Sequence, residues 1–133
     1  MTKVGNKDYI RRERRALQSR RTGTLDPVVN RHLMAIKRIY GTTLADLSVP
    51  CMEPWYVKPR WDLWFRLVIV EGSKDPKDGY SLPKAGRVTG NHDHTTVLCG
   101  VRKFGARHYG TDPKASLDAI RAAYNAFCGE MAA

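Results

Sequence analysis

The fold is predicted chiefly from residues 81–104, which read SLPKAGRVTGNHDHTTVLCGVRKF. Two short helical patterns, 81–88 and 93–106, stand on either side of a turn that contains Gly90. A tight glycine-containing turn between two short helices is typical of a helix-turn-helix. Gly86 stands where the two helices would have to approach each other closely. Because other helical hairpins share this pattern, the spacing favours the motif without identifying it.

The second helix opens on residues 93–96, Asp-His-Thr-Thr. In a helix-turn-helix this end of the helix points its side chains at base edges. Asp accepts from cytosine N4, His donates to purine N7 or to O6 and O4, and the Thr methyl packs on the thymine methyl. Arg102 and Lys103, further along the helix, can reach backbone phosphates.

This stretch resembles the DNA-binding C-terminal domain, domain IV, of the bacterial replication initiator DnaA. The family carries a Gly-Gly-Arg-Asp-His-Thr-Thr-Val run in its recognition helix, followed by Arg-Lys. The resemblance extends over about residues 26–127. The matching residues are Gly86, Asp93, His94, Thr95, Thr96, Val97, Arg102 and Lys103, with Lys58-Pro59-Arg60 and a Tyr40 to Leu47 segment upstream.

The resemblance implies an all-α fold, Trp repressor-like, with the helix-turn-helix at its centre. It implies that Asp93, His94 and Thr95 read bases in the major groove. We expect a second group to contact the DNA backbone or support the motif: Asn91, His92, Thr96, Arg102, Lys103, Lys58, Arg60, Lys84 and Arg87.

Three departures from the family affect this expectation. Asn91 and His92 replace the family Gly-Arg, so one basic contact weakens to a mostly neutral imidazole. The segment before Lys58, CMEPWYV, has no basic residue where the family sends an arginine into the minor groove. Because 133 residues cannot contain the family's ATPase domain, we expect a freestanding DNA-reading module, as in a bacterial, phage or prophage-like regulator.

The surplus charge is concentrated near the N-terminus. The chain carries 23 Lys+Arg and 13 Asp+Glu, a formal net charge of +10, and residues 1–24 hold eight of the basic and two of the acidic residues. We interpret 1–24 as a basic arm, flexible or helical, ahead of a DNA-binding domain at 25–133. Its arginines are suited to phosphate contacts, and the arm could replace the lost minor-groove contact, as homeodomain arms do. They are Arg11, Arg12, Arg14, Arg15, Arg20 and Arg21.

Helical periodicity accounts for most of residues 25–70. Asp26 and Gly41 are expected to bound one helix, and Thr42 to open a short second one ending at Leu47. Residues 49–59 contain three prolines and are expected to form a loop. An amphipathic helix is expected from near Pro59, with Trp61, Trp64, Phe65 and Val68 on one face; a strand at 68–70 is the alternative.

The C-terminal half continues the pattern. Residues 72–79, GSKDPKDG, are expected to form a surface loop, and Gly105 and Gly110 to flank a break. Asp112 is expected to cap a last helix whose buried stripe is Leu117, Ile120, Tyr124 and Phe127. The chain therefore reads as about six helices.

Other chemistries are weakly indicated. His92 and His94, two apart on a helix, point in different directions, so we expect no metal site there. Because no paired carboxylates, metal ligand set or phosphate-binding loop is visible, we also expect no cofactor and no enzymatic activity. Trp61 and Trp64 fit a core, whereas Trp55 is open to either a core or a binding role. No apolar run reaches the roughly 18 residues of a membrane span.

The sequence therefore predicts a cytoplasmic, nucleoid-associated protein that binds specific double-stranded DNA, as a monomer on DNA, and regulates transcription. The alternative is a replication-linked origin-binding or adaptor protein that binds a partner, such as RNA polymerase or a replication protein, at DnaA-box-like DNA.

Overall fold

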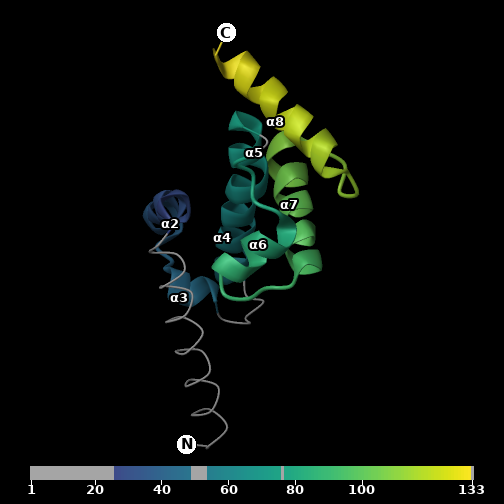
Figure 1. Ribbon diagram of the computed structural model, residues 1–133. Coiled ribbons are helices and arrows are strands. Elements are labelled where there is room, and N and C mark those ends of the chain that lie inside the picture. Colours follow the sequence, from purple (N-terminus) through teal and green to yellow (C-terminus); the bar gives the residue numbers. More distant parts are fainter. Residues whose placement is uncertain (1–25, 49–53, 76, 133) are drawn as a thin grey trace, which may run out of the picture.

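The computed structural model describes residues 26–48, 54–75 and 77–132, and the regular structure in these ranges is entirely helical (Figure 1). The elements are α2 (Pro27–Tyr40), α3 (Leu44–Leu47), α4 (Pro54–Phe65), the π-helix η1 (Arg66–Val70), α5 (Glu71–Lys74), α6 (Leu82–Val88), α7 (His94–Tyr109) and α8 (Leu117–Ala132). The all-α prediction is confirmed in this part of the chain, and the strand alternative at 68–70 is wrong. The arm at 1–24 and Cys51 lie outside the described residues, as does the side chain of Trp55.

Four helices begin at side-chain caps that lie at or within one residue of their predicted starts. Asp26 accepts from the backbone N–H groups of Val28 and Val29, 3.0 and 3.3 Å away. Thr43 forms a capping box with Asp46 at the start of α3. The hydroxyl of Ser81 caps α6 and the carboxylate of Asp93 caps α7. Each cap satisfies an N–H that has no partner within its own helix.

A central column, formed by α4, η1 and α5 in continuous succession, carries the core. In Figure 1 this teal column stands upright, with α7 beside it and α2 on its other side. Helix α6 lies across the base of the column and α7, and α8 crosses near their upper ends.

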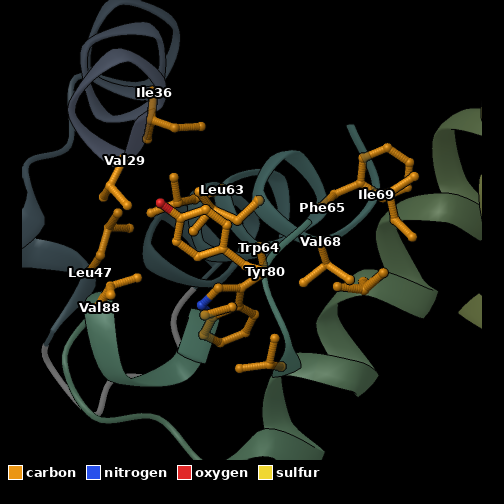
Figure 2. Close-up of a cluster of buried hydrophobic side chains, with 14 of the residues drawn as sticks. Val29, Ile36, Leu47, Leu63, Trp64, Phe65, Val68, Ile69, Tyr80 and Val88 are labelled. Carbon is orange, nitrogen blue, oxygen red and sulfur yellow. The ribbon is translucent and has the colours of Figure 1, made fainter. Parts of the chain in front are cut away.

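The middle of the column is buried around more of its circumference than the single stripe that was predicted. Leu63, Trp64 and Phe65 are each at most 1% exposed. Leu67 and Ile69 are fully buried as well, although they lie off the predicted face. Figure 2 shows Leu63, Trp64, Phe65 and Ile69 pointing outward from the column toward surrounding helices. A helix segment buried around most of its circumference belongs near the centre of a domain.

Two predicted loops are partly helical. Helix α4 begins at Pro54, so Pro59 lies inside it and the predicted loop is wrong from residue 54 onward. An interior proline removes one helical hydrogen bond, but burial of Val57 and Pro59 in the core holds this turn. The loop predicted at 72–79 is also shorter, because residues 72–74 continue the helix as α5. A Cβ on Gly79 would lie 2.7 Å from the Cα of Gly72, so the two glycines allow the returning chain to pack against the helix.

The end of α7 and the start of α8 also differ from prediction. Gly105 does not break α7; it lies inside the helix, where a Cβ would come within 2.8 Å of the Thr111 hydroxyl oxygen. The helix ends at Gly110, which has a left-handed φ of 68°. Asp112 caps a turn rather than α8, accepting from the N–H of Lys114 at 2.7 Å.

Helix α8 begins at Leu117, where the Ser116 hydroxyl accepts from the N–H of Ala119 at 3.2 Å. Of the predicted buried stripe, Ile120 is fully buried. Leu117 and Tyr124 are half-buried at the edge of the core. Phe127 is 45% exposed, and its ring stands edge-on to that of Tyr109 with 5.2 Å between the ring centroids. The prediction of Phe127 as a core residue is therefore wrong.

Candidate nucleic-acid interface

The turn between α6 and α7 is held by a close backbone contact. The N–H of His92 donates to the carbonyl of Gly86 over 3.0 Å. A Cβ at position 86 would lie 2.1 Å from the carbonyl oxygen of His92, so only glycine fits there. Gly90 and Asn91 reverse the chain direction with φ angles of 114° and 61°. The close approach expected at Gly86 is therefore present: α6 is tightest against the backbone of the turn, and Val97 of α7 also lies close to this position.

Buried polar side chains attach the same turn to the core. The indole N–H of Trp64 donates to the Thr89 hydroxyl oxygen over 2.9 Å, and that hydroxyl donates to the Ala85 carbonyl over 2.8 Å. Thr89 is 1% exposed. Because these groups are buried away from water, a donor left without its hydrogen-bond partner would lower the stability of the fold. The turn is thus fixed relative to α4 as well as α6.

His92 lies on the inner side of this turn. Its Nε2 donates to the carbonyl of Leu47 over 2.8 Å, and its ring stands edge-on to Trp64 with 5.2 Å between centroids. These contacts tie the turn to the end of α3. They give the half-buried imidazole a structural role in holding the turn.

The first residues of α7 emerge from this anchored turn into solvent. Residues 93–96, Asp-His-Thr-Thr, are all exposed, whereas Val97, the next residue, is fully buried. The helix therefore presents its first turn outward and packs from its second turn onward. Since α7 is 16 residues long and rests on α4, this exposed end is rigidly supported.

Asp93 organises that exposed end. Its Oδ2 accepts from the Thr95 hydroxyl and from the Thr95 N–H, the latter over 3.1 Å. These hydrogen bonds, the side-chain bond first, hold the pKa of the Asp93 carboxyl below its usual value. Its Oδ1 lies 3.4 Å from Nδ1 of His94, whose side chain is 58% exposed. The carboxylate thus stays ionised and orients its two neighbours, while the His94 ring remains accessible.

The basic residues predicted to contact backbone or support the motif fall into two groups. Lys58, Lys84, Arg87 and Lys103 are exposed, and the Lys103 ammonium lies 5.2 Å from the Trp61 ring centroid. Asn91 and Thr96 are exposed as well.

The two remaining arginines are engaged within the fold. Arg60 is 5% exposed and its Nε donates to the Leu47 carbonyl over 2.9 Å, which leaves its guanidinium almost no surface for a phosphate. Arg102 is half-buried and its Nε donates to the carbonyl of Ala115 over 3.0 Å, joining α7 to the turn before α8.

Two structural residues of this region were missed by the sequence reading. Thr89 was grouped only with the turn, and no local pattern shows that its hydroxyl would meet the indole of Trp64, 25 residues earlier. Leu47 accepts from both Arg60 and His92 through its carbonyl, a role that no side-chain pattern can reveal. Both act through contacts that depend on tertiary packing.

The described ranges contain neither a metal-binding cluster nor a membrane-spanning helix. No group of three or more His, Cys, Asp or Glu side chains in those ranges is placed to hold a metal ion. No helix there has the length and apolar character needed to cross a membrane. Cys99 and Cys128 are exposed free thiols.

The chain has no match among protein-family models, curated proteins or solved structures.

Proposed function

We propose that this protein binds specific sequences of double-stranded DNA through a helix-turn-helix formed by α6 and α7, in the manner of the DnaA domain IV that residues 81–104 resemble. The observation that carries the proposal is the start of α7. Four consecutive exposed polar residues, 93–96, follow directly on a turn that buried contacts fix to the core. A rigid helix end with exposed polar side chains meets the geometric demand of base reading in the major groove.

Each residue of that end has a defined task in the proposal. His94 reads a purine N7 or a carbonyl oxygen with its accessible ring. The Thr95 hydroxyl donates to Asp93, which leaves its methyl group free to pack on a thymine methyl. Asp93 orients both side chains and offers Oδ1 to a cytosine amino group. Thr96 and the N–H groups of the first turn favour a nearby phosphate.

Backbone contacts come from the exposed group of residues: Asn91, Lys58, Lys84, Arg87 and Lys103. Such contacts supply salt-dependent affinity without sequence preference. Arg60, Arg102 and His92 act indirectly, by holding the motif on α3, α4 and the turn before α8. With this division of roles the protein acts as a transcriptional regulator of bacterial, phage or prophage-like genes.

The test compares two histidines on the same helix. His94→Ala removes the proposed base contact, and His108→Ala removes an exposed imidazole at the opposite end of α7. Binding sites are first selected from a random duplex pool with the unmodified protein, and protection of the selected site is then compared among the variants. We expect His94→Ala to lose the site preference while nonspecific duplex binding largely survives, and His108→Ala to keep the preference. An unchanged footprint with His94→Ala would show that α7 does not read the bases.

A second candidate function is an adaptor that binds a partner protein at DnaA-box-like DNA. It is favoured by apolar side chains exposed on α2, where Met34 is 63% and Ile39 is 58% exposed. A mobility-shift experiment at moderate salt with duplex competitor separates the two functions. A sequence-dependent complex formed by the protein alone supports direct DNA reading, whereas DNA retention only with an added polymerase or replication protein supports the adaptor.

A further inference from the structure

A groove rich in cations lies away from the start of α7, between α2, α5 and α6. Its volume is about 420 Å³, and its walls include the 77–80 segment. Four basic side chains line it, against two acidic ones. They are Arg31, Lys74, Lys77 and Lys84, with Glu71 and Asp78.

Glu71 offsets only part of the charge of these cations, because its carboxylate is shared with a buried histidine. It is 4% exposed and accepts from Nε2 of the buried His32 over 2.7 Å. The same oxygen, Oε1, lies 3.7 Å from the Arg31 guanidinium and 3.5 Å from the Lys74 ammonium. The side chains of Arg31 and Lys74 remain 65% and 58% exposed. One carboxylate shared among three partners leaves positive charge facing the groove.

The other two cations are positioned by local structure. The ammonium of Lys84 lies 4.5 Å from the centroid of the Tyr80 ring. Tyr80 is held in turn by its hydroxyl, which donates to Asp26, and by its N–H, which donates to the Leu67 carbonyl over 3.1 Å. The N–H of Lys77 donates to the Asp75 carboxylate over 3.0 Å, which shapes the turn that carries it.

Helix α6 runs from the groove to the turn that precedes α7. Lys84 lies on the groove and Arg87, on the last turn of the same helix, is exposed beside the anchored turn. A helix of seven residues is only about 10 Å long at 1.5 Å per residue. Cations spread over this length can contact successive phosphates of one DNA strand, because a phosphate recurs at every nucleotide.

We propose that this groove binds the phosphodiester backbone of duplex DNA beside the segment that α7 reads. The inference rests on the proposed function and extends the contact surface from the start of α7, along α6, to α2 and α5. The exposed, open arrangement of the cations suits a continuous polyanion, which needs no enclosure, and Arg and Lys are the residues that bind phosphates in this way.

The test removes two groove cations and compares salt dependence. The double variant Arg31→Gln/Lys77→Gln is measured against Lys37→Gln/Lys114→Gln, which loses the same charge at exposed positions outside the groove. Lys84 is left unchanged, because the proposed function already assigns it a backbone contact. Affinity for the selected duplex with flanking sequence is measured over a series of salt concentrations. Since each lost phosphate contact reduces the slope of log K against log salt by about 0.9, we expect the groove variant to lose about 2 from the slope and the control less than about 0.5. Arg31→Lys/Lys77→Arg, which keeps the charge, should restore the slope.

The outcomes distinguish this inference from the proposed function. If the groove and control variants have equal slopes while His94→Ala still abolishes the site preference, the groove does not hold DNA and the reading role of α7 stands. If the groove slope falls while His94→Ala has no effect, backbone binding at the groove stands and base reading by α7 is overturned. If the unmodified protein does not bind duplex DNA at all, both are overturned. Thermal unfolding of each variant confirms that the fold is intact.

Discussion

Gly86 shows how much of the proposed DNA-reading site depends on a single missing side chain. It lies where the chain passes from α6 into the turn, and a Cβ there would meet the backbone oxygen of His92 at 2.1 Å. A backbone carbonyl cannot rotate away as a flexible side chain can. The turn and α6 would therefore have to separate, which would also disturb the Thr89 contacts with Trp64.

We therefore predict that Gly86→Ala destabilises the protein by about 3 kcal/mol, at the upper end of typical overpacking costs. The control is Gly129→Ala, on an exposed part of α8 where a Cβ meets no atom within 4 Å. It should be neutral or stabilising by about 0.5 kcal/mol, since alanine favours the helix. Urea unfolding of both variants measures the difference. Equal stabilities would mean that α6 and the turn are not packed as described.

Charged residues of one type serve different purposes at different positions. Arg60 and Lys58 are two apart in the sequence, yet Arg60 is 5% exposed and bonded to Leu47, whereas Lys58 is exposed. Residue type and motif resemblance place both in one group. Only the neighbours supplied by α3 separate them, because burial is decided by which element covers a side chain.

At the scale of elements, α2 and α5 are joined by a buried ionisable pair. Burial lowers the pKa of His32 and outweighs the opposing influence of Glu71. Burial of Glu71 acts to raise the pKa of its carboxyl, but the hydrogen bond from His32 and the charge of Lys74 hold that pKa below its usual value. The pair is therefore a neutral imidazole that donates to an ionised carboxylate.

We predict that stability falls as the pH falls below about 6.5, the ordinary pKa of histidine. In this range the unfolded chain takes up a proton at His32 that the folded chain resists, so protonation favours unfolding. The contribution of Glu71 has the same sign and is lost at lower pH, as the pH falls from the ordinary carboxyl pKa through the lowered pKa of the folded state. The free energy of unfolding in urea, measured from pH 7.5 to 5, should decrease.

The control for this prediction is His32→Gln, which keeps a donor but cannot titrate. It should flatten the pH dependence over this range, and the exposed His108→Gln should leave it unchanged. A His32→Gln variant as sensitive to pH as the unmodified protein would assign the effect to other groups.

Elements differ in how well their bounds could be predicted. Helices with side-chain caps, such as α2 and α7, begin where Asp26 and Asp93 predict, because the capping bond joins residues two or three positions apart. The start of α4 at Pro54 and that of α8 at Leu117 were misplaced. The prolines at 54 and 59 predicted a loop, but this segment is helical and Val57 and Pro59 are buried. Asp112-Pro113 predicted a helix cap, but Asp112 instead caps a separate turn before α8.

At the scale of the whole molecule, the charge divides into an arm and a helical domain. Residues 1–24 carry eight basic and two acidic residues and account for more than half of the net +10. They lie outside the described residues, so the arm's role is argued from its composition. The residues proposed to read bases, in contrast, are polar rather than basic. Under the proposed function the surplus charge therefore supplies affinity, and these polar residues supply the sequence preference.

Deletion of residues 1–24 is predicted to lower affinity for all duplex sequences alike and to reduce the slope of log K against log salt. Each phosphate contact that the arm makes contributes about 0.9 to that slope. The ratio of affinities for selected and random duplexes should stay the same, because no base-reading residue is removed. Binding isotherms over a salt series measure both quantities. A deletion variant with an unaltered slope would contradict the arm's contact with DNA.

Local chemistry along the chain was enough to predict the helical class and the starts of α2 and α7, and it singled out the candidate segment 93–96. These features depend on bonds and periodicities that span only three or four residues, so they can be inferred directly from the sequence. That all four residues of this segment are exposed depends on the tertiary structure.

The tertiary structure decided which polar side chains are available to a ligand. It placed Arg60 and His92 on one carbonyl, that of Leu47, which is 13 and 45 residues away from them. It also placed the cations of α2, α5 and α6 around one groove. Such contacts join segments distant in the sequence, so they exist only once the column of α4, η1 and α5 is buried and its neighbours have packed around it.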